Sequence, residues 1–266
     1  MALELHFGGQ VWHGSTEYDG FFRFEWKVPG TLPAGWHEVT ITCRDKNGAL
    51  LAEAKGSILV PHITQYAFIS DIDDTILYSY SSTVFRRLYE LLFHNPERRR
   101  IFRETAAYYR LLTAAHTEPA IPNPLFYVSS SEWNLYDYLR RIFRFNDLPE
   151  GIFLLDQVKR WYQLLQTGKT GHSGKLIRIS RILQAFPRQR IVLLGDNSQR
   201  DPEIYKAIAT KYPGQIRAVY IREVRPSKTA ATLAILESLE ASGVEVCFFR
   251  ETREAIAHGR RTGLIV

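Results

Sequence analysis

The first 60 residues alternate between hydrophobic and polar positions with a period of about two. In FFRFEWKV, Phe22, Phe24 and Trp26 recur at every second position, and HEVTITCR repeats the pattern. This period is typical of half-buried β-strands. It predicts antiparallel strands at about 3–12, 20–29, 36–45 and 49–59. The Asn-Gly pair in DKNGALL suits a hairpin turn between the last two.

From Tyr66 onward, short apolar runs are separated by stretches with helical spacing. The runs are YAFIS, LFYVS, GIFLL, RIVLLG, RAVYI and VEVCFF. Between two of them, GKLIRISRILQAF places Leu176, Ile179 and Leu183 on one face of a helix. Strands that alternate with helices indicate βαβ units. We therefore predict a doubly wound α/β domain with a mostly parallel sheet.

The two patterns divide the chain into a small antiparallel β-domain over residues 1–62 and an α/β domain over residues 63–266. Four strands are few for a complete sandwich, so the β-domain is either incomplete or leans on its neighbour. A helical insertion at about residues 78–122 follows the first parallel strand. We expect this insertion to cover the end of the sheet as a cap.

The composition is that of an ordinary globular protein, with 45% hydrophobic and 23% charged residues. No stretch approaches the roughly 20 apolar residues that span a bilayer. The N-terminal stretch MALELHFGGQ lacks the basic start and apolar core of a secretory signal. Cys43 and Cys247 lie in strand-like runs, and we expect both to be buried free thiols. These features favour a cytoplasmic protein.

The net charge of +6 is unevenly distributed along the chain. Residues 1–62 carry 5 basic and 7 acidic side chains, whereas residues 63–266 carry 29 basic and 21 acidic side chains. The basic excess therefore belongs to the α/β domain. A cationic surface favours an anionic partner, such as a phosphate compound, an anionic lipid or a nucleic acid.

Three aspartates follow the first apolar run of the α/β domain within four positions: Asp71, Asp73 and Asp74. Two carboxylates 4 Å apart repel by about 4 kcal/mol at an effective dielectric constant of about 20. A chain that places them at a strand end therefore needs cations to offset the repulsion. Ligands of open α/β sheets bind beyond the carboxyl ends of the strands, so this position suits a functional site.

Polar side chains also follow other predicted strands. Ser129, Ser130 and Ser131 come after LFYV, and Asp196 and later Asp201 come after RIVLLG. Lys175 precedes the helix that leads into RIVLLG. Because the carboxyl ends of parallel strands share one edge of a sheet, these groups are predicted to converge there.

Together these residue types suit phosphoryl transfer. One carboxylate can attack phosphorus to form an aspartyl phosphate, and a second, two residues further on, can protonate the leaving alkoxide and then activate water. The remaining carboxylates can hold a divalent cation such as Mg²⁺. A hydroxyl and a lysine can neutralise the phosphoryl oxygens.

The order strand-DxDxT, strand-Ser, Lys and strand-GDxxxxD resembles that of the haloacid dehalogenase-like phosphatases. More narrowly, SDIDDTI, YVSSSEWNLYDYL and GDNSQRDPEIY resemble the actin-patch phosphatidate phosphatase family of fungi and bacteria, a distant relative of the lipin catalytic domain. The resemblance covers roughly residues 60–226. It implies a haloacid dehalogenase-like fold, a phosphatidate substrate and Mg²⁺ as cofactor.

The resemblance also implies a role for individual residues. Asp71 would be the nucleophile and Asp73 the acid and base. The phosphate-binding residues would be Ser129, Ser130, Lys175 and Thr75, with Thr75 also supporting the loop. The metal ligands would be Asp71, Asp73 through its backbone carbonyl, Asp196 and, in a supporting or water-mediated role, Asp201. The sequence departs from the family pattern at Asn197-Ser198, where Ser-Gly is more usual.

Other interpretations of the same residues stay open at this stage. The aspartates and serines also suit turns and helix N-caps, although the order of all four motifs favours the catalytic interpretation. The substrate is either phosphatidate, a soluble small metabolite or a phosphoprotein. A non-enzymatic alternative is an anionic-membrane binding module with a vestigial site.

The partner expected from these observations is a phosphorylated substrate, with no nucleic acid. The stretch from Lys159 to Tyr162 mixes basic and aromatic side chains, which suits peripheral contact with an anionic membrane. His172 lies in the glycine-rich stretch GKTGHSGK, and a solvent-exposed loop position is the expected one.

Overall fold

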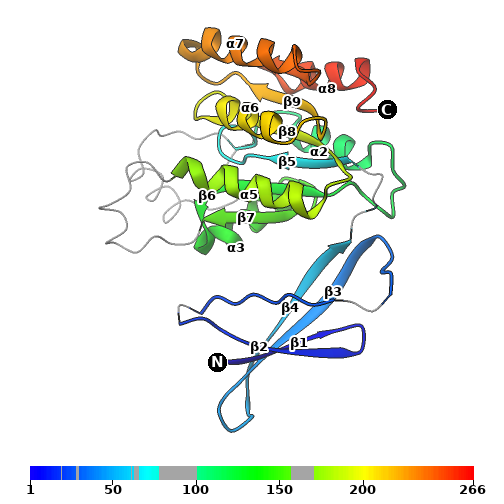
Figure 1. The fold of residues 1–266 in the computed structure, drawn as a ribbon, viewed down its shortest axis with the longest axis vertical. Helices are drawn as coiled ribbons and strands as arrows, with labels where there is room; N and C mark the ends of the chain where they lie inside the picture. The colour runs from blue at the N-terminus through cyan, green and yellow to red at the C-terminus, as the bar shows by residue number, and fades with distance from the viewer. Residues whose placement is uncertain (19, 28–29, 61, 63–65, 78–100, 157–170) are drawn as a thin grey trace. The chain divides into compact units, whose positions relative to one another are not determined.

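The computed structural model describes residues 1–266 except 19, 28–29, 61, 63–65, 78–100 and 157–170 (Figure 1). The described chain forms two compact units, Met1–His62 and Ile63–Val266. The first unit contains a four-stranded antiparallel sheet, and the second contains a six-stranded parallel sheet. The predicted fold class, an α/β fold with a small N-terminal antiparallel sheet, is confirmed.

The sheet of the first unit has the strand order β2-β1-β3-β4. Its strands are β1 (Ala2–Phe7), β2 (Gln10–Ser15), β3 (Gly35–Arg44) and β4 (Leu50–Val60). The predicted strands at 36–45 and 49–59 correspond to β3 and β4, and the loop between them contains the Asn-Gly pair. Gly48 there has a φ of 84°, a value that glycine adopts without steric cost.

Two of the predicted strands are wrong in detail. The run predicted at 3–12 is a hairpin that turns at Gly8 and Gly9, which both have positive φ as a two-residue hairpin turn requires. The run predicted at 20–29 has no regular secondary structure over its described residues 20–27. Phe24 and Trp26 nevertheless pack against the buried cluster of this unit, so their alternation reflects burial without strand pairing.

The parallel sheet of the second unit has the strand order β10-β9-β8-β5-β6-β7. Its strands are β5 (Tyr66–Ser70), β6 (Leu125–Glu132), β7 (Ile152–Asp156), β8 (Arg190–Asp196), β9 (Ile216–Arg222) and β10 (Glu245–Phe249). Each of the six apolar runs forms one strand. The chain leaves β5 towards β6 and β7 on one side and later returns to β8 on the other. The neighbouring strands β5 and β8 therefore form the switch point where such sheets bind ligands.

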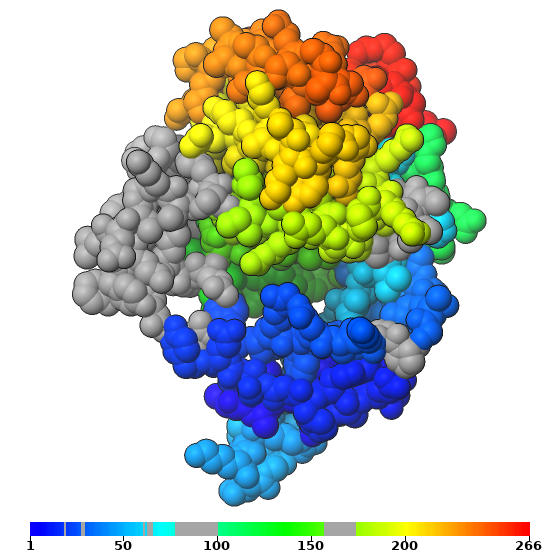
Figure 2. Space-filling view, in the orientation of Figure 1, coloured from blue at the N-terminus to red at the C-terminus, as the bar shows by residue number. Residues whose placement is uncertain are grey.

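Helices cover both faces of this sheet (Figure 1). Side chains of α2, α3 and α8 pack into one buried cluster, and those of α5, α6 and α7 pack into the other. In the space-filling view, α5, α6 and α7 form one continuous face (Figure 2). The helices are α2 (Thr105–Ala114), α3 (Tyr136–Phe145), α5 (Gly171–Ala185), α6 (Asp201–Lys211), α7 (Thr229–Glu240) and α8 (Thr252–Arg261), with short 3₁₀ helices η2 (Trp133–Leu135) and η3 (Pro226–Lys228).

Strand β5 illustrates why the sheet is buried on both faces. Phe68 belongs to the cluster on one face, whereas Ala67 and Ile69 belong to the cluster on the other, and all three are fully buried. Strands covered by helices on both faces are apolar throughout, which explains the unbroken run YAFIS. On α5, the helical spacing predicted from the sequence buries Ile179, Ile182 and Leu183.

Two expected features lie largely outside the described residues, and the expected burial of the cysteines is only partly confirmed. Most of the insertion expected at 78–122, and all of 159–162, lie outside the described residues. Cys247 is buried, but Cys43 is only half-buried, so the expected burial is wrong for Cys43. None of the described helices has the length and hydrophobicity needed to cross a bilayer.

Two buried tyrosines offer a matched test of the core. The Tyr205 hydroxyl donates a hydrogen bond to the Leu194 carbonyl at 2.7 Å, whereas the Tyr108 hydroxyl has no hydrogen-bond partner within the described chain. We expect Tyr205→Phe to lower the free energy of unfolding by about 1 kcal/mol and Tyr108→Phe to leave it unchanged or raise it. Urea unfolding of the two variants measures both values. An equal loss in Tyr108→Phe would show that its hydroxyl is hydrogen-bonded after all.

Candidate active site

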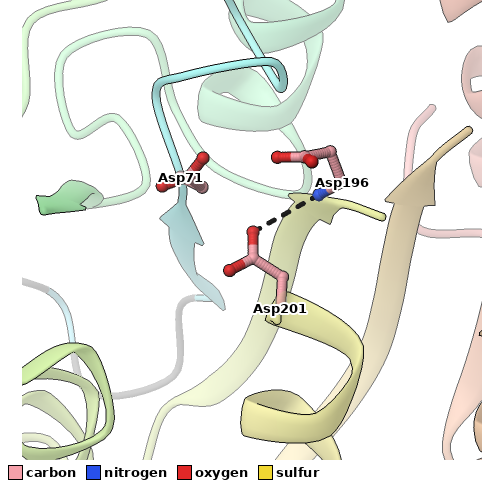
Figure 3. A group of neighbouring side chains, drawn as sticks. All are labelled: Asp71, Asp196 and Asp201. Carbon is pink, nitrogen blue, oxygen red and sulfur yellow. Dashed lines mark hydrogen bonds between the residues drawn. The ribbon is translucent and has the colours of Figure 1, made fainter. Parts of the chain in front are cut away.

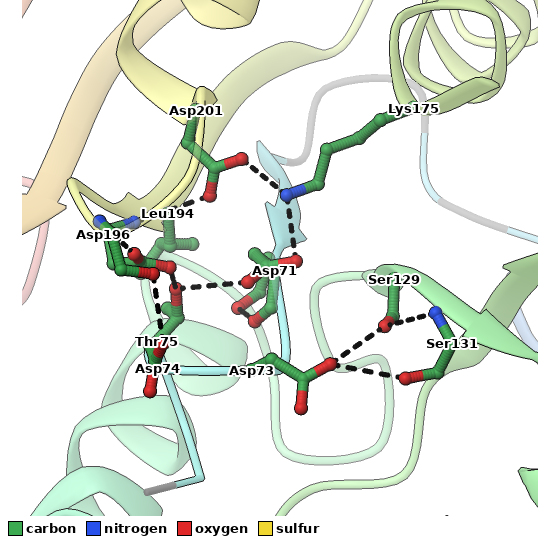
Figure 4. Close-up of polar contacts among 12 residues, drawn as sticks. Asp71, Asp73, Asp74, Thr75, Ser129, Ser131, Lys175, Leu194, Asp196 and Asp201 are labelled. Atoms are coloured by element: carbon green, nitrogen blue, oxygen red, sulfur yellow. Dashed lines mark hydrogen bonds and ion pairs between the residues drawn. The ribbon is translucent and has the colours of Figure 1, made fainter. Parts of the chain in front are cut away.

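The polar residues singled out from the sequence come together at the carboxyl edge of the parallel sheet (Figure 4). Asp71 follows β5, Ser129 lies in β6 and Asp196 ends β8. Lys175 projects from α5, and Asp201 is the first residue of α6. Apart from Ser130, Ser131 and Asp74, the side chains of the predicted site are buried. The topology thus gathers residues up to 130 positions apart.

The loop after β5 is held in place by its backbone. The Asp71 amide donates to the Leu194 carbonyl of β8 at 2.9 Å, and the Asp74 amide donates to the Leu77 carbonyl at 2.8 Å. Asp74 has a φ of 61°, in the left-handed region that aspartate tolerates better than most residues. This turn places the side chains of Asp71 and Asp73 within the site.

Lys175 bridges two of the buried carboxylates. Its Nζ lies 2.7 Å from Oδ1 of Asp71 and also forms an ion pair and hydrogen bond with Oδ1 of Asp201. The side chains of Lys175, Asp71 and Asp201 are only 4%, 2% and 1% exposed. Charges this deeply buried need well-placed partners, because the desolvation penalty is several kcal/mol for each ion.

Asp196 completes a group of three buried carboxylates (Figure 3). Asp71, Asp196 and Asp201 each offer one oxygen, and these three oxygens all lie within 4.8 Å of one another. The Thr75 hydroxyl donates to Asp196 Oδ2 at 3.1 Å and lies 3.5 Å from Asp71 Oδ2. The Asp196 amide donates to Asp201 Oδ2 at 3.3 Å, which fixes the third carboxylate to the strand.

The charges of this group do not balance. Three carboxylates face one ammonium group, so the fully ionised cluster of Asp71, Asp196, Asp201 and Lys175 lacks two positive charges. Carboxylate oxygens are the ligands that hard divalent cations prefer. The donor set and its charge therefore fit a divalent metal ion, which Asp71 and Asp196 would hold with Asp201 beside them.

The pKa values of Asp71, Asp196 and Lys175 reflect both burial and this excess of negative charge. Burial raises the pKa of Asp71 well above its usual range; Lys175 opposes this rise, whereas Asp201 and Asp196 add to it. Burial, followed by the charge of Asp201, raises the pKa of Asp196 to about 7. Burial lowers the pKa of Lys175, but Asp201 and Asp71 raise it more, so the ammonium stays charged.

Asp73 faces a different set of partners. Its Oδ2 accepts hydrogen bonds from the hydroxyls of Ser129 at 3.3 Å and Ser131 at 3.2 Å. Its carboxylate is therefore directed toward the β6 serines and is not part of the three-carboxylate group (Figure 4). The arrangement separates one carboxylate that faces a cation from another that faces hydroxyls.

The sequence assigned no role to some residues that shape the site. Ser131, placed by the sequence at the strand end with its neighbours, donates a hydrogen bond to Asp73, whereas Ser130, predicted to bind phosphate, is exposed. Arg178 donates to the Ser129 carbonyl at 3.2 Å and pairs with Asp156 at the end of β7. The sequence signal for Arg178 was its position three residues after Lys175, about one turn further along the same helix.

Asn197 and Gly195 also have structural roles, which the motif GDNSQRD did not reveal. The Asn197 side-chain oxygen accepts hydrogen bonds from the amides of Val224 and Arg225, both at 2.8 Å, and so anchors the loop after β9. A Cβ atom on Gly195 would lie 2.5 Å from Asp201 Oδ2, a distance that excludes any side chain without displacement of Asp201. Asn197, which departs from the family pattern, therefore anchors this loop at a buried position beside Asp196.

The chain is similar to known proteins over more than half of its length. The family described as "Phosphatidate phosphatase APP1, catalytic domain" matches residues 66–223. Phosphatidate phosphatase APP1 of Saccharomyces cerevisiae is 29% identical over 154 residues, which is 58% of this chain and 25% of that protein. An uncharacterized protein of Schizosaccharomyces pombe is 25% identical over 160 residues, or 59% of this chain and 25% of that protein. The matched region thus spans about a quarter of each relative.

The buried charge cluster generates a stability prediction. Lys175→Met leaves two buried carboxylates without their ammonium partner, and we expect a loss of about 3–5 kcal/mol in the free energy of unfolding in EDTA. Magnesium should return part of that loss, because a cation that binds only the folded state stabilises it. Urea unfolding with and without magnesium measures both effects.

The matched control is Lys206→Met, which removes an exposed lysine from α6. We expect this variant to change the free energy of unfolding by less than about 0.5 kcal/mol. A similarly small change in Lys175→Met would mean that the buried carboxylates are protonated or solvated and do not depend on the ammonium.

Proposed function

The chain belongs to the family of phosphatidate phosphatase APP1 catalytic domains, and from this premise we propose that it is a magnesium-dependent phosphomonoester phosphatase whose substrate is phosphatidate. The observation that carries the proposal is the placement of two differently partnered carboxylates, Asp71 and Asp73, on one loop beside Lys175. The reaction would proceed through an aspartyl phosphate on Asp71.

In the first step, an oxygen of Asp71 attacks phosphorus and the bond to the ester oxygen breaks. Asp73 gives its proton to the leaving alkoxide, which departs as an alcohol. In the second step, Asp73 takes a proton from water, whose oxygen attacks the phosphorus of the aspartyl phosphate. Asp71 is released as a carboxylate and inorganic phosphate leaves.

The surroundings of the two carboxylates support these roles. The contact with Lys175 favours the ionised form of Asp71 that a nucleophile requires, although burial opposes it. The serine hydroxyls on Asp73 hold its carboxyl group on the other side of the loop. The two carboxylates of the β5 loop thus have different partners, as the proposed division between a nucleophile and an acid and base requires.

The proposed cation is Mg²⁺, held by Asp71 and Asp196 with the backbone carbonyl of Asp73 and with Asp201 in support. When bound, it would offset the charge of the carboxylates and of the substrate phosphate. Asp201 serves mainly to position its neighbours, since its two oxygens are engaged by Lys175 and by the Asp196 amide. An all-oxygen donor set favours Mg²⁺ over softer metals.

Phosphate binding is assigned to the hydroxyls of Ser129 and Thr75 and to the Lys175 ammonium, with Ser130 on the exposed side of the same stretch. Arg178 would keep the Ser129 backbone in position through its hydrogen bond to that carbonyl. These donors surround the place where negative charge increases as the phosphoryl group is transferred.

Lipid specificity rests on the family membership alone, because the site residues themselves require only a phosphomonoester. The name of the yeast relative supplies the substrate, and the matched 154 residues of this chain cover a quarter of that protein. Peripheral contact with an anionic membrane is part of the proposal, since phosphatidate resides in bilayers. The stretch 159–162 is the sequence feature that suggested such contact.

The two catalytic carboxylates are tested by removing their charge. We expect Asp71→Asn and Asp73→Asn each to lower kcat for phosphate release by at least about 10³-fold, because each removes a chemical step, with unfolding still cooperative. Asp137→Asn, an exposed aspartate at the start of α3, is the matched control and should retain activity. Near wild-type turnover in either site variant would refute its assigned role.

Substrate and metal are tested together by a phosphate-release panel. Mixed micelles of phosphatidate are compared with soluble phosphomonoesters and a phosphopeptide, each in EDTA and after magnesium is restored. We expect hydrolysis of phosphatidate to exceed that of the soluble compounds and to disappear in EDTA. Preference for a soluble ester would establish the soluble-substrate alternative, full activity in EDTA would exclude the metal, and no release at all would favour the membrane-binding module.

A further inference from the structure

A second pocket, distinct from the carboxylate site, lies where β9 and β10 end. Its volume is about 340 Å³, and four arginines and two glutamates line it, which gives a net formal charge of +2. Arg222 is the last residue of β9, and Arg250 follows the last residue of β10. Pockets of this volume accept small ligands, and the charge of this one favours an anion.

Arg222 provides a fixed cation in the wall of this pocket. It is only 2% exposed, and its guanidinium donates to the Thr75 carbonyl at 3.2 Å, the Arg250 carbonyl at 3.1 Å and the Thr252 hydroxyl at 3.0 Å. The Phe102 ring stacks against it, with 4.1 Å between the guanidinium carbon and the ring centroid. These contacts orient the guanidinium before any ligand arrives.

Two of the other three arginines are free to exchange partners. All three side chains are highly exposed, and each has a glutamate partner: Arg250 with Glu223, Arg253 with Glu251 and Arg103 with Glu104. The pairs of Arg253 and Arg103 are exposed on both sides and contribute about 0–1 kcal/mol, so little is lost when either arginine turns to a phosphate. Glu223 is only 7% exposed, so Arg250 stays paired with it and contributes a fixed charge. Arginine binds phosphate through two parallel hydrogen bonds, as it does a carboxylate, so a phosphate can replace a glutamate partner.

Helix α8 begins in the same wall, since Thr252 is its first residue. The amino end of a ten-residue helix carries a partial positive charge, which favours a phosphate group. Arg103, the buried Arg222 and the segment that holds Arg250, Arg253 and this helix end come from three parts of the chain and point to the same class of ligand.

We propose that this arginine pocket binds a phosphate-bearing anion other than the one hydrolysed. Thr75 contacts both sites: its hydroxyl donates to Asp196, and its carbonyl accepts from Arg222. Thr75 would therefore be the residue that separates an anion in the pocket from the active site. The proposal stands on the pocket alone and does not require the catalytic assignment.

The phosphate group is supplied either by a lipid head group or by a soluble compound, and two experimental arms separate these sources. One arm titrates the full chain with inorganic phosphate by calorimetry. The other measures its binding to phosphatidylcholine vesicles with and without phosphatidylglycerol. Both arms are run in EDTA at fixed ionic strength, because the three active-site carboxylates repel anions when no cation is added.

The test variant is Arg103→Gln/Arg253→Gln, which removes two exposed charges and leaves Arg222 and the pair of Arg250 and Glu223 in place. We expect binding in at least one arm to weaken by about tenfold or more, as the loss of charge-assisted hydrogen bonds predicts. Loss in the phosphate arm assigns a soluble ligand, and loss in the vesicle arm alone assigns a lipid head group. Urea unfolding confirms that the variant retains its fold.

The matched control is Arg181→Gln/Arg188→Gln, which removes two exposed arginines at and beyond the C-terminal half of α5. This control should bind as the wild type does in both arms. Unchanged binding in the test variant, or equal losses in test and control variants, would overturn the proposal, because the attraction would then belong to the overall charge of the chain. Failure here would leave the magnesium-dependent hydrolysis unaffected.

Discussion

The whole arrangement depends on the cost of burying several carboxylates within a few ångströms of one another. Asp71, Asp196 and Asp201 share a volume that one ammonium group, that of Lys175, only partly neutralises. Their electrostatic repulsion is tolerated because they are attached to strands and to the N-terminus of a helix. These elements are stabilised by the hydrophobic clusters on the two faces of the sheet. Such an uncompensated site would favour whatever supplies the missing positive charge, and this is the physical basis of the metal binding and phosphoryl chemistry that we propose.

The parallel sheet supplies the rigidity that this arrangement requires. Asp71 and Asp196 extend from neighbouring strands, and the Leu194 carbonyl binds both the Asp71 amide and the Tyr205 hydroxyl. Asp71 is thereby attached to β8 as well as to its own strand. Side chains fixed in this way need little reorganisation when charge moves during a reaction.

The fold and most of the site could be predicted from the sequence because both follow from short-range patterns. The apolar runs located all six parallel strands, and the strand-end rule placed the catalytic candidates on one edge. The strand expected at 20–29 failed because alternation reports burial, whereas strand pairing depends on a partner distant in sequence. The roles of Ser131 and Arg178 were missed for a similar reason, since their contacts depend on side-chain directions that no local pattern encodes. The arginine pocket likewise combines residues 102–104, 222 and 250–253.

The hydrogen bond between Thr75 and Asp196 joins residues 121 positions apart, and this separation bears on how the molecule folds. Parallel strands paired over such distances form late, because a long loop must close before any contact rewards it. The carboxylates of Asp71 and Asp196 therefore meet only when β8 pairs with β5. Until then they are solvated and barely repel one another, so their repulsion arises together with the hydrophobic clusters that offset it, since both clusters contain residues of β5 and β8.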